Sequence, residues 1–173
     1  CNRKTSIVFT SGSTGMPKAV LHTLGNHYYS SLGSNINIKF DSSNKWLIVL
    51  PLHHVSGLSI IFRAAQSGGK IVVKEQGMEI HEALKINEPT HISLVPHQLQ
   101  LLLNSGKNID ILRKMEAILI GGSSVPENII EQSYEYGLNL FVSYGSTEMC
   151  SQITCTKSKD TLEHLKTSGC LLK

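Results

Sequence analysis

Residues 46–51 read Trp-Leu-Ile-Val-Leu-Pro, a continuous apolar run that a proline ends. Such a run, without polar alternation, is typical of a strand that is buried on both faces of a parallel sheet. A stretch with helical spacing at residues 57–67 and a second apolar run at residues 70–73 follow it. Because short strands alternate with helices here, the sequence predicts an α/β fold.

The alternation of strands and helices continues on both sides of this run. Strands are expected at residues 6–9, 91–95, 117–120 and 140–143. A helix is expected at residues 23–38, where four apolar side chains recur every four positions and predict one apolar face: Leu24, Tyr28, Leu32 and Ile36. We therefore expect layered, mostly parallel sheets flanked by helices, in one domain or most of one.

Short polar signals mark several helix ends. Gly137 follows a helical stretch and is expected to end it in a left-handed conformation. Ser124 with Glu127, and Asp160 with Glu163, have the three-residue spacing of a capping box. This spacing predicts that helices start at these two places.

Composition excludes several classes of protein. Of the 173 residues, 40% are apolar and 17% are charged, which is typical of a soluble folded domain. The formal net charge of +3 is small and evenly spread, so it does not indicate a nucleic-acid partner. The apolar runs are too short to predict a membrane span.

Cysteine usage indicates a reducing, cytoplasmic compartment, and histidine usage disfavours a zinc site. The four cysteines form no C-x-x-C pair, and buried free thiols are expected at Cys150 and Cys155. The eight histidines are scattered, and the adjacent His53 and His54 would point to opposite faces of a strand. A zinc site is therefore not predicted.

Residues 10–18 form a loop of unusual composition, Thr-Ser-Gly-Ser-Thr-Gly-Met-Pro-Lys, directly after the strand expected at 6–9. Glycines let backbone N–H groups approach an anion, hydroxyls add donors, and Lys18 supplies a point charge for a phosphate tail. The loop is not a Walker A motif, because two residues separate Gly15 from Lys18 and an alanine follows the lysine. It predicts a phosphate-binding loop of another kind.

A second polar segment, Tyr144-Gly145-Ser146-Thr147-Glu148, follows the strand expected at 140–143. Ligands of open parallel sheets bind outside the carboxyl ends of the strands, so this segment and loop 10–18 are expected to face one crevice. Tyr144 offers an aromatic face for a purine, Thr147 a hydroxyl for a phosphate, and Glu148 an oxygen ligand for Mg²⁺. A surface turn with an exposed glutamate is the alternative interpretation.

Together, the two motifs and their order resemble those of the adenylate-forming (AMP-binding) family, which includes acyl-CoA synthetases, peptide-synthetase adenylation domains and luciferases. Residues 51–57, Pro-Leu-His-His-Val-Ser-Gly, are similar to the family segment that walls the carboxylate pocket. Residues 121–123, Gly-Gly-Ser, are similar to the glycine-rich strand end beside adenine. The resemblance covers the whole chain and implies that residues 1–173 are the central part of the AMP-binding N-terminal domain.

The resemblance implies ATP and Mg²⁺ as cofactors and coenzyme A as a co-substrate, in a two-step reaction through an acyl-adenylate. The first step requires charge stabilisation around phosphorus rather than a nucleophilic side chain. The residues implied to bind nucleotide are Thr10, Ser11, Gly12, Ser13, Thr14, Gly15, Lys18, Gly121, Gly122, Ser123, Tyr144, Gly145 and Thr147. Those implied to bind the carboxylate are His54, Ser56, Gly57, Arg63 and Ser151, and the implied catalytic residues are Lys18, Thr147 and Glu148, of which Glu148 would hold the metal.

Within the family, residues 25–27, 54–60 and 151–153, with Arg63, resemble the branch that ligates o-succinylbenzoate (2-succinylbenzoate) to coenzyme A in menaquinone biosynthesis. That substrate has two carboxylates, of which one is activated. The planar fork of Arg63 is suited to pair with the other carboxylate. The alternative is a surface arginine on the helix expected after Gly57.

Two other functions stay open. One is an acyl- or aryl-CoA ligase that acts on a different carboxylate. The other is a non-catalytic nucleotide-binding scaffold, which the joint presence of Lys18, Thr147 and Glu148 disfavours. The family pattern normally continues with a ribose-binding aspartate, a hinge and a small C-terminal domain, so this chain by itself is expected to have little or no ligase activity.

Overall fold

The computed structural model describes residues 2–10, 16–106 and 108–173. The helices and strands in these ranges are β1 (Lys4–Thr10), β2 (Lys18–Thr23), α1 (Leu24–Asn37), β3 (Lys45–Ile48), α2 (Val55–Ser67), β4 (Lys70–Val73), α3 (Ile80–Asn87), β5 (His91–Leu94), α4 (Pro96–Ser105), α5 (Ile109–Lys114), β6 (Ala117–Ile120), α6 (Glu127–Glu135), β7 (Leu140–Ser146), β8 (Ser151–Cys155), α7 (Leu162–Leu165) and β9 (Cys170–Leu171). No helix in these ranges has the length and apolar character that crossing a membrane requires.

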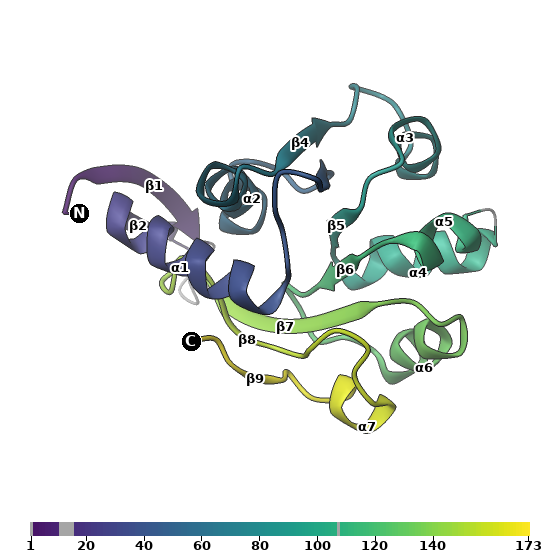
Figure 1. Cartoon of the computed structure of the whole chain (residues 1–173). Helices are drawn as coiled ribbons and strands as arrows, with labels where there is room; N and C mark the ends of the chain where they lie inside the picture. Colours follow the sequence, from purple (N-terminus) through teal and green to yellow (C-terminus); the bar gives the residue numbers. More distant parts are fainter. Residues whose placement is uncertain (1, 11–15, 107) are drawn as a thin grey trace.

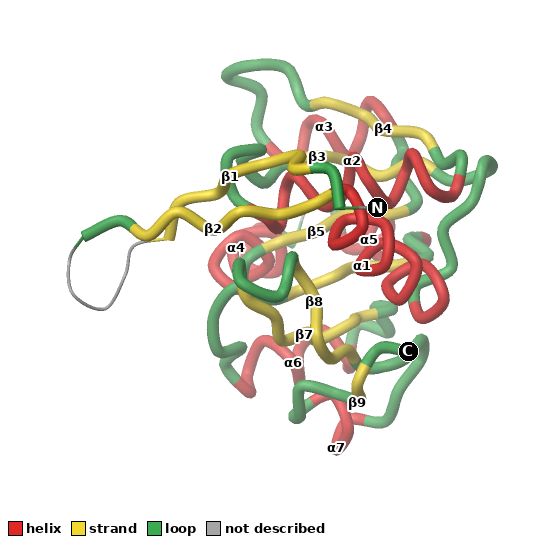
Figure 2. Tube along the Cα trace, turned by 90° about the vertical axis from the view of Figure 1, so that its left-hand side faces the viewer, coloured by secondary structure: helices red, strands yellow, loops and turns green. Residues whose placement is uncertain are grey.

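A seven-stranded sheet organises the chain, in the order β4-β3-β5-β6-β7-β8-β9. Strands β4 to β7 of this order run parallel, and β8 and β9 are added antiparallel at one edge. Helices lie on both faces of the parallel part (Figure 1). Strands β1 and β2 pair with each other as a separate antiparallel ribbon (Figure 2). The predicted helix-flanked, mostly parallel sheet is confirmed.

Alternate side chains of the parallel strands supply two hydrophobic cores, one on each face of the sheet. Leu47 and Ile118 belong to the first core, against which helices α3 to α6 pack. The neighbouring residues Trp46 and Leu119 belong to the second core, which α2 covers. The unbroken apolar run at residues 46–50 is thereby explained, because both faces of β3 are buried.

Trp46 anchors the second core. Its side chain is fully buried, its indole Nε1–H donates to Ser93 Oγ at 3.1 Å, and its ring meets that of Phe40 edge-on at 5.0 Å. Truncating a buried aromatic side chain typically costs about 3–5 kcal/mol. The contacts of Trp46 therefore hold β3 firmly against β5.

The predicted apolar face of α1 is wrong as a core-facing surface. Leu24, Tyr28 and Ile36 are exposed, whereas the buried positions carry small or polar residues: Gly25, His27, Ser31, Gly33 and Ser34. Small side chains let α1 lie close to α2 and β8. Polar side chains of the same helix bind the segment beyond β7, since Ser30 Oγ donates to the Cys150 carbonyl at 2.9 Å.

The helix start predicted at Ser124 is also wrong. Helix α6 begins at Glu127 with Pro126 as its N-cap, so Ser124 lies in the preceding loop. Pro126 has no side-chain acceptor, so α6 starts without a side-chain cap. The predicted helix end is confirmed, since Gly137 follows α6 with φ +68°.

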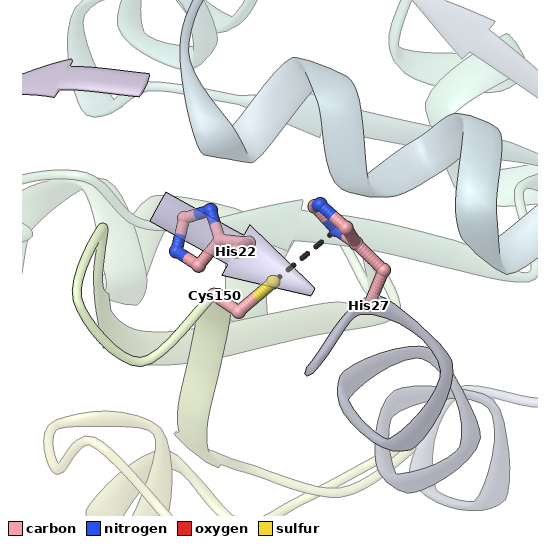
Figure 3. Close-up of side chains that lie close together, drawn as sticks. All are labelled: His22, His27 and Cys150. Atoms are coloured by element: carbon pink, nitrogen blue, oxygen red, sulfur yellow. Dashed lines mark hydrogen bonds between the residues drawn. The ribbon is translucent and has the colours of Figure 1, made fainter. Parts of the chain in front are cut away.

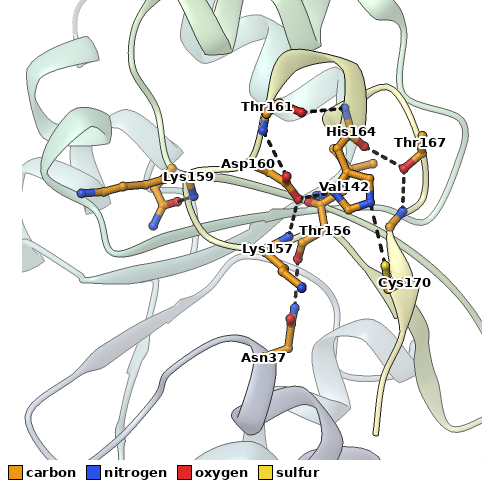
Figure 4. A network of polar contacts seen from close by, with 12 residues as sticks. Asn37, Val142, Thr156, Lys157, Lys159, Asp160, Thr161, His164, Thr167 and Cys170 are labelled. Atoms are coloured by element: carbon orange, nitrogen blue, oxygen red, sulfur yellow. Dashed lines mark hydrogen bonds and ion pairs between the residues drawn. The ribbon is translucent and has the colours of Figure 1, made fainter.

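The capping box predicted at Asp160 is replaced by another arrangement. Thr161 is the N-cap of α7, and its hydroxyl accepts a hydrogen bond from the His164 N–H. Asp160 instead accepts from the Lys157 N–H at 2.9 Å and lies 2.5 Å from the His164 ring nitrogen Nδ1 (Figure 4). The aspartate therefore stabilises the turn before α7 rather than its first turn.

Gly57 brings α2 unusually close to the chain that leaves β3. A Cβ atom at this position would lie 2.4 Å from the Pro51 carbonyl oxygen and 2.7 Å from that of Leu50. Neither oxygen can move away without shifting the backbone at the carboxyl end of β3. Only a residue without a Cβ fits this contact.

We expect Gly57→Ala to lower the free energy of unfolding by about 1–3 kcal/mol, because the added methyl group overpacks a backbone contact. Chemical denaturation of the protein measures this. The matched control is Ser56→Ala, an exposed side chain in the same helical turn, which should change the free energy by less than about 0.5 kcal/mol. An unchanged unfolding midpoint for the Gly57 variant would show that the close approach is not required.

Candidate active site

A cavity of about 360 Å³ lies at the carboxyl ends of the parallel strands, beside the start of α2. Its lining includes eight of the residues that the sequence singles out: His54, Ser56, Arg63, Gly121, Gly122, Gly145, Thr147 and Ser151. These residues come from segments far apart in the sequence. They meet because the carboxyl ends of neighbouring parallel strands share one edge of the sheet.

A neighbouring cavity of about 390 Å³ shares Gly122, Ser143 and Gly145 with the first. Its lining includes Ser123 and Tyr144, the residues expected on the purine side of a nucleotide. Ligand pockets in proteins typically measure about 300–1,000 Å³. The two adjoining cavities therefore offer room for a ligand with two separate parts.

The strand predicted at residues 140–143 is confirmed and extends further than expected. Strand β7 continues to Ser146 and pairs antiparallel with β8, with an irregularity in register between Tyr144 and Gly145. A Cβ at Gly145 would lie 2.1 Å from the Ser151 carbonyl oxygen. The segment of residues 144–148 is thus held by a hairpin rather than by a free loop.

The predicted phosphate-binding loop is described only at its two ends. Thr10 and Lys18 face each other across the β1–β2 ribbon, and Lys18 is exposed. Ser11, Gly12, Ser13, Thr14 and Gly15 lie outside the described residues. The ribbon contacts the cavity wall through His22, whose ring nitrogen Nε2 lies 2.6 Å from the Thr147 carbonyl oxygen.

Glu148 follows the cavity-lining Thr147 and is exposed. The salt bridges formed by the described part of the chain do not involve its carboxylate. Carboxylate oxygens are ligands that Mg²⁺ accepts in proteins. The exposed carboxylate that follows the cavity-lining Thr147 is therefore a candidate ligand for a magnesium ion.

Arg63 is a buried cation in the cavity wall, which rules out the surface position considered above. Its side chain is 2% exposed, and its guanidinium lies 5.2 Å from the centroid of the Trp46 ring. Its Nη2 donates to Gln152 Oε1 at 2.8 Å and to Ser151 Oγ at 3.3 Å. Desolvation lowers the pKa of Arg63 to about 10, so the side chain stays charged at neutral pH.

Two donors of the Arg63 side chain, Nε and Nη1, are buried and have no hydrogen-bond partner among the described residues. No carboxylate in the described ranges forms a salt bridge with it. Burying a charge without an ionic partner is costly, because desolvation of the ion lowers the free energy of unfolding by about several kcal/mol. An anionic group in the cavity would complete the hydrogen bonding of this cation.

Gln152 is a site residue that the sequence analysis did not single out. Its Oε1 accepts from both Ser34 Oγ, at 2.8 Å, and Arg63 Nη2, so it links α1 to α2. Its own Nε2 is buried without a partner in the described part of the chain. The available signal was its position directly after Ser151, in a segment that already resembled the ligase branch.

Comparison with known proteins adds three findings. The family model of the AMP-binding enzymes matches residues 4–173. The chain is 42% identical over 149 residues to a 2-succinylbenzoate–CoA ligase of Staphylococcus aureus, which covers 85% of this chain and 30% of that protein. It is similar in fold to the o-succinylbenzoate coenzyme A synthetase of Bacillus subtilis in complex with AMP, with TM-score 0.87 and 35% identity over 99% of this chain and 44% of that chain.

The Bacillus subtilis enzyme in complex with ATP and magnesium ion is also similar. The TM-score is 0.83 and the identity 36%, over 96% of this chain and 35% of that chain. The present chain thus spans 30% of the length of the curated relative that it matches.

We expect Arg63→Met to raise the free energy of unfolding of the ligand-free protein by about 1–3 kcal/mol, because it removes an unpaired buried charge and keeps an apolar side chain of similar length. Thermal unfolding without ligand measures this. The matched control is Arg3→Met, an exposed arginine, which should change stability by less than about 0.5 kcal/mol. If the Arg63 variant were clearly less stable than the wild type, Arg63 would be a structural residue rather than a ligand-binding one.

Proposed function

The chain belongs to the AMP-binding enzyme family, and on that premise we propose that the full-length protein joins 2-succinylbenzoate to coenzyme A, with ATP, in menaquinone biosynthesis. The observation that carries the proposal is the buried guanidinium of Arg63 in the cavity wall, two of whose donors have no partner in the described part of the chain. The 42% identity to a ligase of this specificity supports it. Because the chain spans 30% of that relative, this activity is proposed for the whole protein and not for residues 1–173 alone.

The proposed reaction has two steps. A carboxylate oxygen of the substrate attacks the α-phosphorus of ATP. The bond between the α-phosphorus and the oxygen that bridges it to the β-phosphate breaks, and pyrophosphate leaves. The thiol of coenzyme A then attacks the acyl carbon, its proton passes to solvent, and AMP leaves. Neither step requires a nucleophilic side chain, so the protein contributes binding, orientation and charge stabilisation.

The residues at the strand ends suit the nucleotide. Thr147 lines the cavity with a hydroxyl and would contact the α-phosphate, and Tyr144 would lie against adenine beside Gly121 and Gly122. Thr10 and Lys18, at the two ends of the phosphate-binding loop, would hold the terminal phosphates together with the loop between them. The structure of the Bacillus subtilis relative with ATP and magnesium supports the same cofactors here.

Glu148 is the residue that we propose to hold magnesium, because its carboxylate is exposed next to Thr147. A magnesium ion held by Glu148 would supply positive charge against the phosphates. The exposed Lys18 would add a second positive charge from the ribbon side. Charge stabilisation of this kind commonly accounts for about 2.7–4 kcal/mol for each group involved.

The carboxylate substrate would occupy the first cavity. His54 and Ser56 line its wall from the start of α2, and Gly57 keeps that helix close to β3. The second carboxylate of the substrate would accept a hydrogen bond from Nε or Nη1 of Arg63, which have no partner among the described residues. A charge-assisted hydrogen bond of this kind fixes the orientation of the ligand as well as its affinity.

A cytoplasmic location belongs to the same proposal. It is supported by the free, buried thiols of Cys150 and Cys155, as expected for a reducing compartment.

Arg63→Lys tests the substrate. We expect KM for 2-succinylbenzoate to rise by about 10–100-fold, because a compact ammonium group replaces the planar guanidinium, and each 1.4 kcal/mol lost is tenfold. KM for ATP, which is proposed to bind beside Tyr144 and Thr147 rather than at Arg63, should change little. Coenzyme A thioester formation by the full-length protein is the measurement, with Arg3→Lys as the control.

Two outcomes would contradict this assignment. If the Arg63 variant kept its affinity for the diacid, the second carboxylate would bind elsewhere. If the wild type used benzoate or fatty acids as well as 2-succinylbenzoate, the protein would be an acyl- or aryl-CoA ligase of another specificity.

Glu148→Gln tests the metal. We expect the rate of pyrophosphate release to fall by about 100-fold or more, since one charged group of the transition state is lost. The Mg²⁺ concentration that gives half the maximal rate should also rise. The matched control is Glu135→Gln, an exposed glutamate of α6. A wild-type rate in the Glu148 variant would show that Glu148 does not hold the magnesium ion. Failure of the wild-type full-length protein to bind ATP in calorimetry would favour a non-catalytic scaffold.

A further inference from the structure

Three side chains that are not part of the proposed reaction meet in the interior between β2, α1 and the turn that joins β7 to β8 (Figure 3). They are His22, His27 and Cys150, which are exposed by only 2%, 1% and 3%. One ring nitrogen of each histidine and the sulfur of Cys150 lie within 4.8 Å of one another. In the described ranges the chain therefore brings two imidazoles and a thiol together, although 123 positions separate His27 from Cys150.

His22 presents an unpaired nitrogen. Its Nε2 lies 2.6 Å from the Thr147 carbonyl oxygen, and because a carbonyl only accepts, Nε2 must carry the ring proton of the neutral imidazole. Nδ1 is then left with a free lone pair. It is buried and has no hydrogen-bond partner among the described residues. An unsatisfied buried acceptor typically costs about 1–3 kcal/mol.

The ring of His27 is oriented by contacts to both of its nitrogens and to its face. Its Nε2 lies 2.8 Å from Ser6 Oγ, its Nδ1 lies 3.2 Å from Cys150 Sγ, and its ring stacks on Phe62 with centroids 3.8 Å apart. Histidines that bind metals are usually oriented by such an outer partner on the second nitrogen. Burial, with a smaller contribution from His22, lowers the pKa of His27 to about 4, so its imidazole is neutral at pH 7 and able to act as a ligand.

A reactive cysteine does not explain this group. Burial raises the pKa of the Cys150 thiol to about 11, and nucleophilic cysteines have lowered rather than raised values. A hydrogen bond from the thiol to His27 leaves Nδ1 of His22 without a partner. A single cation between the three side chains would engage all of them.

We propose that His22, His27 and Cys150 form a binding site for a thiophilic divalent cation of the zinc class. Two imidazoles and one thiolate match the ligand preferences of Zn²⁺, with a fourth position open to water. As the zinc–sulfur bond forms, the thiol loses its proton to solvent. Ligand atoms around tetrahedral zinc lie about 3.5 Å apart. His27 and Cys150 are already at 3.2 Å, so the adjustment falls on His22, which lies within 4.8 Å of them.

The site lies at a junction that matters for the nucleotide. His22 belongs to the strand that starts at Lys18, and Cys150 follows Glu148 by two positions. A bound ion would therefore tie the ribbon, α1 and the β7–β8 turn to one another. Zinc is expected to raise the thermal unfolding temperature of the protein by mass action.

The test uses the full-length protein, freed of metal by a chelator and kept in excess Mg²⁺ so that oxygen sites are filled. Zn²⁺ titration by calorimetry should show a single ion per chain. Cys150→Ala and His22→Gln should each weaken zinc binding by at least about 10–100-fold, the loss that even an outer partner of a metal ligand produces. The matched controls are Cys155→Ala, an equally buried thiol outside the group, and His164→Gln; both should bind zinc as the wild type does.

Co²⁺ substitution in the wild type provides a measurement that does not depend on how the variants fold. A thiolate-to-cobalt charge-transfer band, with the visible bands of a tetrahedral ion, is the expected spectrum. Absence of the charge-transfer band would overturn the proposal. So would wild-type zinc affinity in the folded His22 variant, or loss of binding in the control variants.

Discussion

Burial of the parallel strands on both faces sets the arrangement of the rest of the domain. Leu47 and Ile118 enter one core while their neighbours Trp46 and Leu119 enter the other, so each face of the sheet needs helices. Every parallel strand then has to return through a crossover, and all carboxyl ends fall on the same edge. The cavity and its polar residues lie at that edge, where the segments that follow β3, β5 and β6 meet.

Arg63 shows how a stable core and a binding site share one face of the sheet. Its guanidinium lies over Trp46, which anchors the second core, yet two of its donors have no partner among the described residues. Such an arrangement lowers the free energy of unfolding and suits an anionic ligand that binds after the protein has folded. Sites of function are where proteins commonly depart from full hydrogen bonding of buried groups.

Helix α1 contributes polar contacts rather than an apolar surface. Ser30, Ser34 and Asn37 follow one another at helical spacing and bind Cys150, Gln152 and Thr156, which lie along the chain from the β7–β8 turn through β8. These hydrogen bonds hold the segment after Glu148 in place. They also explain why Gln152 reaches Arg63 and why the sulfur of Cys150 faces His27.

The sequence by itself determined the α/β class, the apolar strand that starts within residues 46–50 and the helix end at Gly137. These features depend on neighbours a few positions apart, where periodicity and backbone preference act. The functions of the polar segments at 10–18 and 144–148 stay predictions. Tertiary structure alone decided which side chains of α1 are buried, namely its small and polar ones. It also decided the continuation of β7 through Tyr144, the burial of Arg63 and the proximity of His22 to Cys150. Each of these depends on which elements pair or pack together, and such tertiary contacts leave no local pattern in one sequence.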